Sequence, residues 1–291
     1  MKIGLCGMGN MGRNHLRVCK KLEDEFDDFE LTSLYDPAIA TANNKAKFLD
    51  HARLLLDGVI ICAPSNQHVD IALELLSVNS ELKLLIEKPI DDDIQKAEGL
   101  LKYSNNIFVG HIERFNPAVK KLKNLIDSRK ITGITVVRTK RLGNFAARSS
   151  QYVNLDLLVH DVDIVNFLLN SSSSKSHLLK NQTRSDGKTD HAVLVSMYKN
   201  KEKTVLISEA SWIEPEKIRN LEIVCNEGKY YMDYIKQEIK FVSYTGDIEK
   251  IHVDKKEPLY EELVHFKEFL YGNKETGCSV QAAINALREV S

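Results

Sequence analysis

Six residues near the start of the chain constrain its fold most strongly. Residues 7–12 read GMGNMG, which has the G-x-G-x-x-G spacing, with an apolar run before it at Ile3–Cys6 and a helical pattern after it at Asn14–Leu22. The first glycine allows a tight turn, the second lets a pyrophosphate approach the backbone, and the third packs helix on strand. Similar loops occur without any ligand and in methyltransferases and kinases, so the strand and helix around the loop carry the prediction of a dinucleotide site.

The first hundred residues continue to alternate between strand and helix. Short apolar strands separated by amphipathic helices predict a parallel sheet that is covered on both faces, an α/β Rossmann domain. The stretch between Lys47 and Val59 leaves little room for the further strand that such sheets usually have. Strands are predicted at Leu31–Tyr35, Val59–Ala63, Leu84–Ile86 and Ile107–Val109, and helices at Ala38–Leu49, Val69–Val78 and after Asp91–Asp93.

After about Arg114 the pattern changes to two helices and then a run of strands, whose links contain Gly228 and Gly246 as hairpins would. We therefore predict a Rossmann domain at 1–113 and an α+β domain with a mainly antiparallel open sheet at 114–291, its last helix a candidate to pack back on the first domain. Ser171–Ser174 is predicted to be a surface loop. The predicted strands are Thr135–Lys140, Ala192–Tyr198, Thr204–Ser211, Leu221–Cys225, Tyr230–Tyr234 and Ile239–Tyr244; the helices are Pro117–Ser128, Leu155–Leu169, Tyr260–Leu270 and Val280–Val290.

Composition excludes several classes of protein. The 291 residues include 40 Lys and Arg against 41 Asp and Glu, so a whole-protein electrostatic grip on nucleic acid is not expected. No apolar run approaches the roughly 20 residues of a membrane span. The five cysteines form no C-x-x-C pair and there is no zinc-like spacing of histidines, so we expect no metal site and a reducing, cytoplasmic location. They are Cys6, Cys19, Cys62, Cys225 and Cys278.

Asp36 ends the second predicted strand and points to the choice of cofactor. A carboxylate at this place accepts hydrogen bonds from the adenosine ribose hydroxyls and repels a 2′-phosphate, and no arginine follows it immediately. These features favour NAD over NADP. The alternative is that Asp36 only caps the turn before Pro37, which the strand end and the glycine loop together make the weaker interpretation.

Two further strand ends carry polar groups. Glu87-Lys88-Pro89 stands where open α/β sheets bind ligands, and a lysine there could steady a developing alkoxide. From this tripeptide alone, an ordinary surface lysine is the stronger interpretation. The segment Pro64-Ser65-Asn66-Gln67-His68 follows the strand before it. It predicts a cofactor contact, or alternatively a simple helix cap at Ser65 or Asn66.

The helix predicted at Leu155–Leu169 is almost entirely apolar, yet it carries Asp156, His160 and Asp163 at positions i, i+4 and i+7. Buried ionisable groups are costly unless they are paired or used. A lone buried histidine is more often structural. A carboxylate one turn away favours a site in which Asp156 orients His160 and His160 accepts a proton.

Together these motifs resemble the Gfo/Idh/MocA oxidoreductases. The resemblance covers residues 3–163 and rests on GMGNMG with His15 after it, APSNQH, EKP, and the D-x-x-x-H of DLLVHDVD. It implies a nicotinamide cofactor, catalysis by Lys88, Asp156 and His160, and a second domain whose open sheet forms a homodimer or homotetramer. The implied cofactor-binding residues are Gly7, Gly9, Asn10, Met11, Gly12, Asp36, Pro64, Ser65, Asn66, His68, Glu87 and Lys88.

Within that family the second half is similar to UDP-N-acetylglucosamine 3-dehydrogenases, in GHIERFNPAV, SWIEPEKIRNLEIV, DYIKQEI and EPLYEELVHF. The similarity implies oxidation of a sugar 3-hydroxyl to a ketone, followed by a partner aminotransferase, for lipid A or another surface glycan. Open alternatives are another sugar, an inositol or an imine as substrate, or a non-catalytic NAD-binding regulator. Candidate substrate contacts are Lys88, Asp156, His160, Arg114, Asn116, Lys217, Arg219 and Tyr234; for the last five, solvated rim positions are equally supported. Trp212 could stack on uracil, but a core position is favoured.

Overall fold

The computed structural model describes residues 1–39, 42–144, 152–182, 187–199, 203–273 and 277–291. The chain divides into two compact units, one of Met1–Ile112 with Glu257–Ile284 and the other of Glu113–Lys256 with Asn285–Ser291. The first division lies next to the boundary predicted at residue 113. The segment Glu257–Ile284, predicted within the second domain apart from its last helix, is grouped with the first unit.

The first unit is built on a five-stranded sheet in the order β2-β1-β3-β4-β5, with every neighbouring pair parallel. This confirms the predicted doubly wound sheet. The order reverses between β1 and β3, which is where sheets of this kind bind ligands at their carboxyl ends. The strands are β1 (Lys2–Cys6), β2 (Glu30–Tyr35), β3 (Gly58–Ile61), β4 (Lys83–Glu87) and β5 (Ile107–Gly110).

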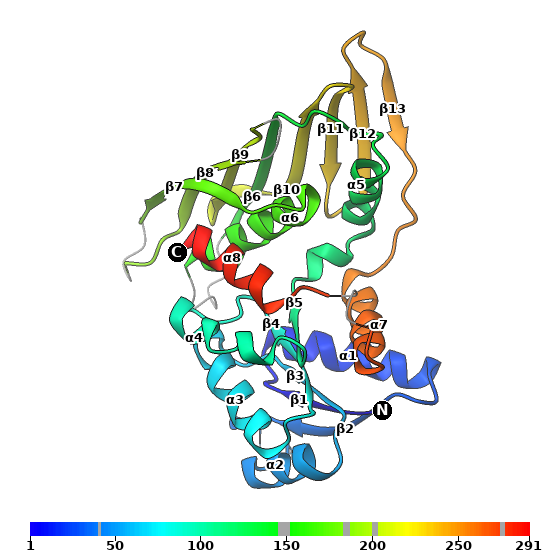
Figure 1. Cartoon of the computed structure of the whole chain (residues 1–291), viewed down its shortest axis with the longest axis vertical. Helices are drawn as coiled ribbons and strands as arrows, with labels where there is room; N and C mark the ends of the chain where they lie inside the picture. Colours follow the sequence, from blue (N-terminus) through cyan, green and yellow to red (C-terminus); the bar gives the residue numbers. More distant parts are fainter. Residues whose placement is uncertain (40–41, 145–151, 183–186, 200–202, 274–276) are drawn as a thin grey trace. The chain divides into compact units, whose positions relative to one another are not determined.

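Among the described residues, five α-helices belong wholly to this unit, and Figure 1 shows them around the sheet. On α7, Phe266 and Phe269 contact Phe108 of β5 edge to face, with ring centroids 5.8 and 5.9 Å apart, so this late segment completes the core of the first unit. The helices are α1 (Asn10–Glu25), α2 (Lys45–Leu54), α3 (His68–Val78), α4 (Ile94–Glu98) and α7 (Pro258–Leu270); the short 3₁₀ turns are η1 (Ser65–Gln67), η2 (Leu101–Tyr103) and η3 (Ile112–Phe115), the last at the division between the units.

Helix α2 differs from the prediction of Ala38–Leu49. It begins after Asn44, whose side-chain oxygen accepts a hydrogen bond from the Lys47 amide at 2.9 Å, so the cap and not the apolar pattern sets its start. From residue 44 to 57, all of which the structure describes, the chain forms this helix and no strand, and Asn43 before it makes only an isolated bridge with Tyr35 of β2. The shortage of room for a further strand is therefore real, and the sheet ends at β2.

The second unit contains an eight-stranded sheet in the order β13-β12-β11-β10-β6-β9-β8-β7. All neighbouring pairs are antiparallel except β6 and β9, which confirms the mainly antiparallel prediction. The strands are β6 (Val136–Asn144), β7 (Ser173–Asn181), β8 (His191–Tyr198), β9 (Val205–Ser211), β10 (Ile213–Cys225), β11 (Gly228–Asp233), β12 (Glu238–Ser243) and β13 (Ile248–Ile251).

The two strands that the sequence does not predict, β7 and β13, are the edge strands of this sheet. Their side chains are mostly exposed and polar, so they lack the apolar alternation of a half-buried strand. The loop predicted at Ser171–Ser174 extends only to the start of β7 at Ser173.

One face of this sheet is covered by helices and the other is open. The helices are α5 (Pro117–Asp127), a π turn η4 (Asn154–Leu158), α6 (Val159–Leu169) and the last residues of α8 (Val280–Val290). Along β8, Leu194 and Tyr198 are buried whereas Val195 and Met197 are 40% and 48% exposed. Figure 1 shows α5 and α6 along the covered face. None of the described helices has the length and apolar character needed to cross a bilayer.

Candidate functional site

The glycine loop follows β1 and has the geometry of a phosphate cradle. Gly7 has a φ of 91°, and a Cβ there would lie 2.6 Å from the backbone of Cys62 and Ala63. A Cβ on Gly12 would lie 2.0 Å from the Gly7 carbonyl oxygen. At Gly9, by contrast, a Cβ would meet nothing within 4 Å. The first and third glycines are thus required by packing, while the second faces open space that a phosphate could use.

Helix α1 begins at this loop with its amide groups available to an anion. Its N-cap is Gly9, which has no side chain to accept from them, and only the Arg13 amide is bonded back to the Gly9 carbonyl, at 3.0 Å. The first amides of a helix have no intrahelical partner, and the helix dipole favours negative charge at this end. Asn10, Met11 and Gly12 therefore fit a bound pyrophosphate.

Asp36, at the end of β2, joins that strand to the glycine loop. One carboxylate oxygen accepts from the Met8 amide at 2.7 Å and the other from the Ala38 amide at 2.8 Å. The bond from Ala38 is the turn cap that the sequence analysis gave as the alternative role of Asp36. An ionised carboxylate has about four acceptor positions, so two remain for ribose hydroxyls. Asp36 can cap the turn and bind a ribose together, and the ribose contact stays a prediction.

The loops after β3 and β4 are tied together by His68. Its ring is 1% exposed, and its Nδ1 and Nε2 lie 2.9 and 2.8 Å from the carbonyl oxygens of Pro89 and Ala63. Both ring nitrogens thus lie against backbone carbonyl oxygens inside the protein, so His68 bridges the two loops. The exposed residues Pro64 and Asn66 are the better candidates for cofactor contact.

Glu87 is the last residue of β4 and is 4% exposed. His15 of α1 donates from Nε2 to its Oε1 at 2.6 Å, and the Lys88 amide donates to its Oε2 at 3.2 Å. Burial would raise the pKa of Glu87, but the hydrogen bond and charge of His15 and the charges of Lys88 and His68 outweigh it and lower the pKa. Glu87 is thus an ionised group below the half-buried Lys88. The Lys88–Pro89 peptide bond is cis.

Donor atoms of His15, Glu87 and Cys62 lie within 4.8 Å of one another, a combination of residue types that can hold a metal ion. We assign no metal to it, because His15 and Glu87 already bond each other directly.

The apolar helix of the second unit begins with a π turn. Asn154–Leu158 has the i→i+5 bonding of a π-helix, and the α-helix starts only at Val159. The stripe predicted for Asp156, His160 and Asp163 assumed an uninterrupted α-helix, so this register is wrong between Asp156 and His160. Both residues are half-buried, whereas Asp163 is 1% exposed. Single π turns within helices are frequent at functional sites.

Two buried ion pairs hold α6 through aspartates that lie one and three residues after His160. Asp161 accepts from Arg141 Nε at 2.8 Å, and Asp163 accepts from Arg114 Nη2 and Nε at 2.6 and 2.8 Å. Arg141 of β6 also donates to Glu113 at 2.8 Å and stacks on Tyr234, with 4.5 Å from its guanidinium carbon to the ring centre. Burial would lower the pKa of Arg141, but the charges of Asp161 and Glu113 outweigh it and raise the pKa. Charged pairs therefore fix the start of α6 directly after its histidine.

Three of the candidate substrate residues make contacts inside the protein. Arg114 is engaged with Asp163, and Tyr234 is 4% exposed against Arg141. Asn116 caps α5 by accepting from the Ala118 amide at 3.1 Å, and it donates to the Tyr234 carbonyl at 3.1 Å. The structure gives these three residues internal roles, so we do not carry them forward as substrate contacts.

The two other candidates lie on β10. Lys217 is exposed. Arg219 is half-buried and donates from Nη1 to the Ile218 carbonyl at 2.8 Å and to the Leu142 carbonyl, and its pKa is lowered by burial and by the charge of Arg141. Trp212 is 5% exposed and so occupies a core position.

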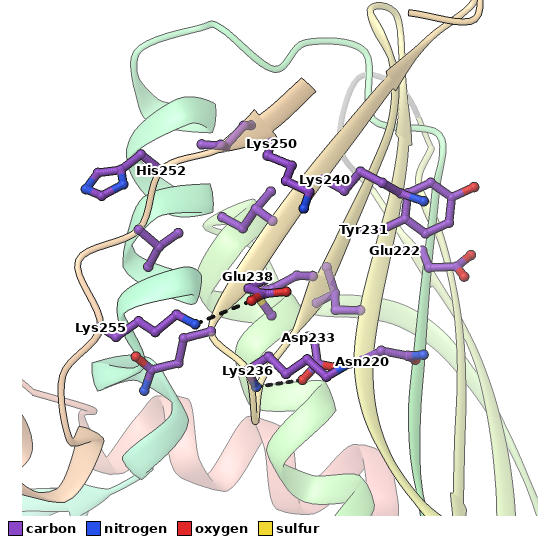
Figure 2. Close-up of a pocket in the computed structure, with 16 residues that line it drawn as sticks. Asn220, Glu222, Tyr231, Asp233, Lys236, Glu238, Lys240, Lys250, His252 and Lys255 are labelled. Carbon is purple, nitrogen blue, oxygen red and sulfur yellow. Dashed lines mark hydrogen bonds and ion pairs between the residues drawn. The ribbon is translucent and has the colours of Figure 1, made fainter. Parts of the chain in front are cut away.

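A cavity of about 620 Å³ lies over strands β10–β13 (Figure 2). Its lining includes Tyr231, Lys240 and Lys250, and Glu238 with its ion-pair partner Lys255 at 3.4 Å. Neither Asp156 nor His160 lines it. It is therefore separate from the predicted catalytic residues of this unit.

Comparison with known proteins identifies the family that the first unit matches. Residues 1–111 match the Gfo/Idh/MocA family, described as an oxidoreductase family with an NAD-binding Rossmann fold. The chain is 30% identical over 136 residues to the rhizopine catabolism protein MocA of Rhizobium meliloti, covering 42% of this chain and 41% of that protein. It is 26% identical over 199 residues to an inositol 2-dehydrogenase of Rhodococcus erythropolis, covering 62% and 56%. The chain thus spans between two fifths and just over half of these relatives' lengths.

Solved structures share the whole fold at low sequence identity. A UDP-N-acetylglucosamine 3-dehydrogenase of Acidithiobacillus ferrooxidans superposes with a TM-score of 0.86 at 21% identity, covering 100% of this chain and 95% of that one. An oxidoreductase of Agrobacterium radiobacter, in complex with NAD⁺, L-tartaric acid and magnesium, superposes with a TM-score of 0.84 at 14% identity, covering 100% and 94%. At these identities the likeness establishes the fold alone.

Proposed function

Because the chain belongs to the Gfo/Idh/MocA family of NAD-binding oxidoreductases, we propose that it oxidises the 3-hydroxyl of a nucleotide-sugar with NAD as hydride acceptor. The proposed substrate is UDP-N-acetylglucosamine and the product is the 3-keto sugar. The observation that carries the proposal is the glycine loop, with two glycines required by packing and a third that faces open space at the start of α1. A Rossmann domain binds a dinucleotide pyrophosphate in this arrangement.

The proposed reaction removes a hydride and a proton from the carbinol. Bound NAD supplies the hydride acceptor, and this chemistry belongs to the cofactor. His160 accepts the hydroxyl proton, Asp156 orients its ring and stabilises the imidazolium, and the Lys88 ammonium stabilises the developing alkoxide. The buried pairs Arg141–Asp161 and Arg114–Asp163 support this assignment, because they fix the helix that carries His160.

The choice of substrate rests on the sequence resemblance of the second unit and on the fold shared with a UDP-N-acetylglucosamine 3-dehydrogenase. A nucleotide-sugar carries a diphosphate, which favours Arg and Lys as partners. Lys217 and Arg219 on β10 are the cationic candidates that we retain. We also propose that a partner aminotransferase converts the 3-keto sugar to a 3-amino sugar, for lipid A or another surface glycan.

We propose that the chain forms a homodimer or homotetramer through the open face of its second sheet. On that face Val195 and Ile207 are cross-strand neighbours, 40% and 38% exposed, with Met197 next to them at 48%. A contiguous exposed apolar patch of this kind is typical of a protein interface.

The cysteines of the described residues are all free thiols, which supports the proposed cytoplasmic location.

The experiment is a substrate panel with NADH formation as the measured signal. UDP-N-acetylglucosamine, other UDP-sugars, myo-inositol and free sugars are each supplied with NAD and, in parallel, with NADP. We expect the highest kcat/KM for UDP-N-acetylglucosamine with NAD. Oxidation of myo-inositol in preference to any nucleotide-sugar would overturn the substrate assignment in favour of the second candidate, which the inositol 2-dehydrogenase relatives suggest.

The same preparation separates the remaining candidates. Consumption of NADH with ketones or imines, and no oxidation by NAD, would mean a reductase. Binding of NAD without turnover of any compound would favour a non-catalytic regulator.

A further inference from the structure

A group of ionisable side chains is buried in the first unit below the end of β4, and the proposed mechanism leaves most of it unused. His15 and Glu262 are fully buried, at 0% exposure, and Glu87 is 4% exposed. Cys62, after β3, has its sulfur within 4.8 Å of the donor atoms of His15 and Glu87. Burying such groups is costly, so their arrangement calls for a physical reason.

The contacts in this group connect the cofactor helix to the catalytic lysine. His15 is in the second turn of α1, the helix that begins at the glycine loop, and it donates to Glu87 Oε1 at 2.6 Å. The other oxygen of Glu87 accepts the Lys88 amide at 3.2 Å. A single carboxylate thus bonds both to the helix that receives the pyrophosphate and to the backbone of the lysine.

The surroundings leave Glu87 little freedom to move. A Cβ on Gly110 of β5 would lie 3.5 Å from both the Cα and the Cδ of Glu87. The charged or titratable groups that act on it are His15 from α1, Lys88 next to it, His68 from α3, Cys62 after β3 and Glu262 from α7.

Glu262 shows where the buried negative charge resides. Neither of its oxygens has a hydrogen-bond partner among the residues that the structure describes. Burial, and then the negative charge of Glu87, raise the pKa of Glu262 well above its ordinary value, whereas the pKa of Glu87 is lowered. Burial likewise raises the pKa of the Cys62 thiol. Within this group, negative charge is therefore favoured on Glu87 over Glu262.

We propose that His15 and Glu87 form a positioning pair that fixes Lys88 relative to the cofactor helix. His15 keeps the carboxylate ionised in a buried place and fixes its orientation. This inference rests on the proposed function, because it assigns Lys88 to the stabilisation of the alkoxide.

The test compares four variants of the full-length protein. His15→Leu removes the hydrogen bond, Glu87→Gln keeps the shape but removes the charge, and His15→Gln restores a donor of similar reach. His51→Gln is the matched control, because His51 is a half-buried histidine of the same unit that bonds Ser33 Oγ at 3.0 Å. Each variant is measured for kcat, KM and their pH profiles, for NAD affinity by calorimetry, and for melting temperature.

We expect His15→Leu and Glu87→Gln to lower kcat by about tenfold to a hundredfold and to shift its pH profile, with little change in NAD affinity. His15→Gln should recover most of kcat, and His51→Gln should match the wild type. If both variants melt earlier but keep the wild-type kcat and pH profile, the pair is only structural and the inference is wrong.

A second measurement needs no substrate and so separates this inference from the proposed function. The rate at which Lys88 is acetylated by a trace of acetic anhydride at fixed pH is followed by mass spectrometry. His15→Leu and Glu87→Gln should change this rate several-fold, because loss of the pair alters the position of Lys88 and hence the access of the reagent to its amine. An unchanged rate in Glu87→Gln would overturn the inference. Failure of the wild type to oxidise any sugar, with the rate changed as expected, would overturn only the proposed function.

Discussion

The two units hold their buried charges by different means. In the first unit the groups are acids and imidazoles: Glu87 is bonded to His15, and burial raises the pKa of Glu262. In the second unit two arginines, Arg141 and Arg114, hold the carboxylates beside His160. A guanidinium does not lose its proton at any ordinary pH, whereas imidazole and carboxyl groups do. The cations of the second unit's framework are therefore permanently charged, while burial raises the pKa of its Asp161 carboxyl. The first unit relies on titratable groups alone.

The strongest test of this comparison removes one member of the permanent framework. Asp161→Ala leaves the Arg141 guanidinium, 3% exposed, with less compensation inside the protein. Breaking a buried pair in this way costs about 3–5 kcal/mol. We expect a fall of that size in the free energy of unfolding, measured by denaturant titration.

The control for Asp161→Ala is Glu238→Gln. Glu238 lies on β12, and the substitution breaks its exposed ion pair with Lys255. An exposed pair contributes about 1 kcal/mol or less, so this variant should stay close to the wild type. Equal losses in the two variants would mean that the buried pair is no stronger than a surface one.

The next test concerns the titratable group that the framework holds. His160→Ala should lower kcat about 10²- to 10⁴-fold, the usual contribution of a general base, while NAD affinity stays unchanged. The control is His177→Ala, an exposed histidine on β7 of the same unit. Steady-state turnover and calorimetry with NAD check both variants. Turnover within twofold of the wild type would remove His160 from the mechanism.

A smaller effect is expected at the cofactor end of the first unit. Asp36→Asn removes the charge that repels a 2′-phosphate, so the preference for NAD over NADP should fall about tenfold in Kd, equivalent to about 1.4 kcal/mol. The matched control is Asp57→Asn, since Asp57 also accepts a backbone amide, from Lys2 at 2.7 Å. An unchanged preference in Asp36→Asn would leave Asp36 as a turn cap alone.

The sequence predicts the parts of this molecule whose signals are local. The glycine loop, Asp36 and the strand ends are each defined by residues close together in the chain, and the structure places them at the carboxyl ends of neighbouring strands. The start of α2 is missed because one cap at Asn44 outweighs the apolar pattern before it. The π turn is missed because a one-residue change of register leaves no mark on a helix that is apolar almost all round.

The ion pairs could not be predicted from the sequence, because their partners are far apart in the chain. Glu87 is 72 residues from His15, and Asp163 is 49 residues from Arg114. An arginine that would suit a diphosphate equally suits a buried carboxylate, and only the packing of η3 on α6 decides between them. Likewise, Glu262 in EPLYEELVHF reads as part of a solvated helix face, whereas α7 buries it completely.

The smallest effect we expect is also the most specific to the first unit. A carboxyl whose pKa is raised on folding contributes most to stability below its unfolded pKa of about 4.3, and that contribution is lost as the pH rises toward the folded pKa. Glu262 is such a group. Glu262→Gln, which resembles the protonated acid, should therefore match the wild type near pH 4 and be slightly more stable near pH 8. Melting temperatures of both proteins measured from pH 4 to 8 check this. If Glu262→Gln becomes less stable than the wild type as the pH rises, Glu262 is ionised in the folded protein.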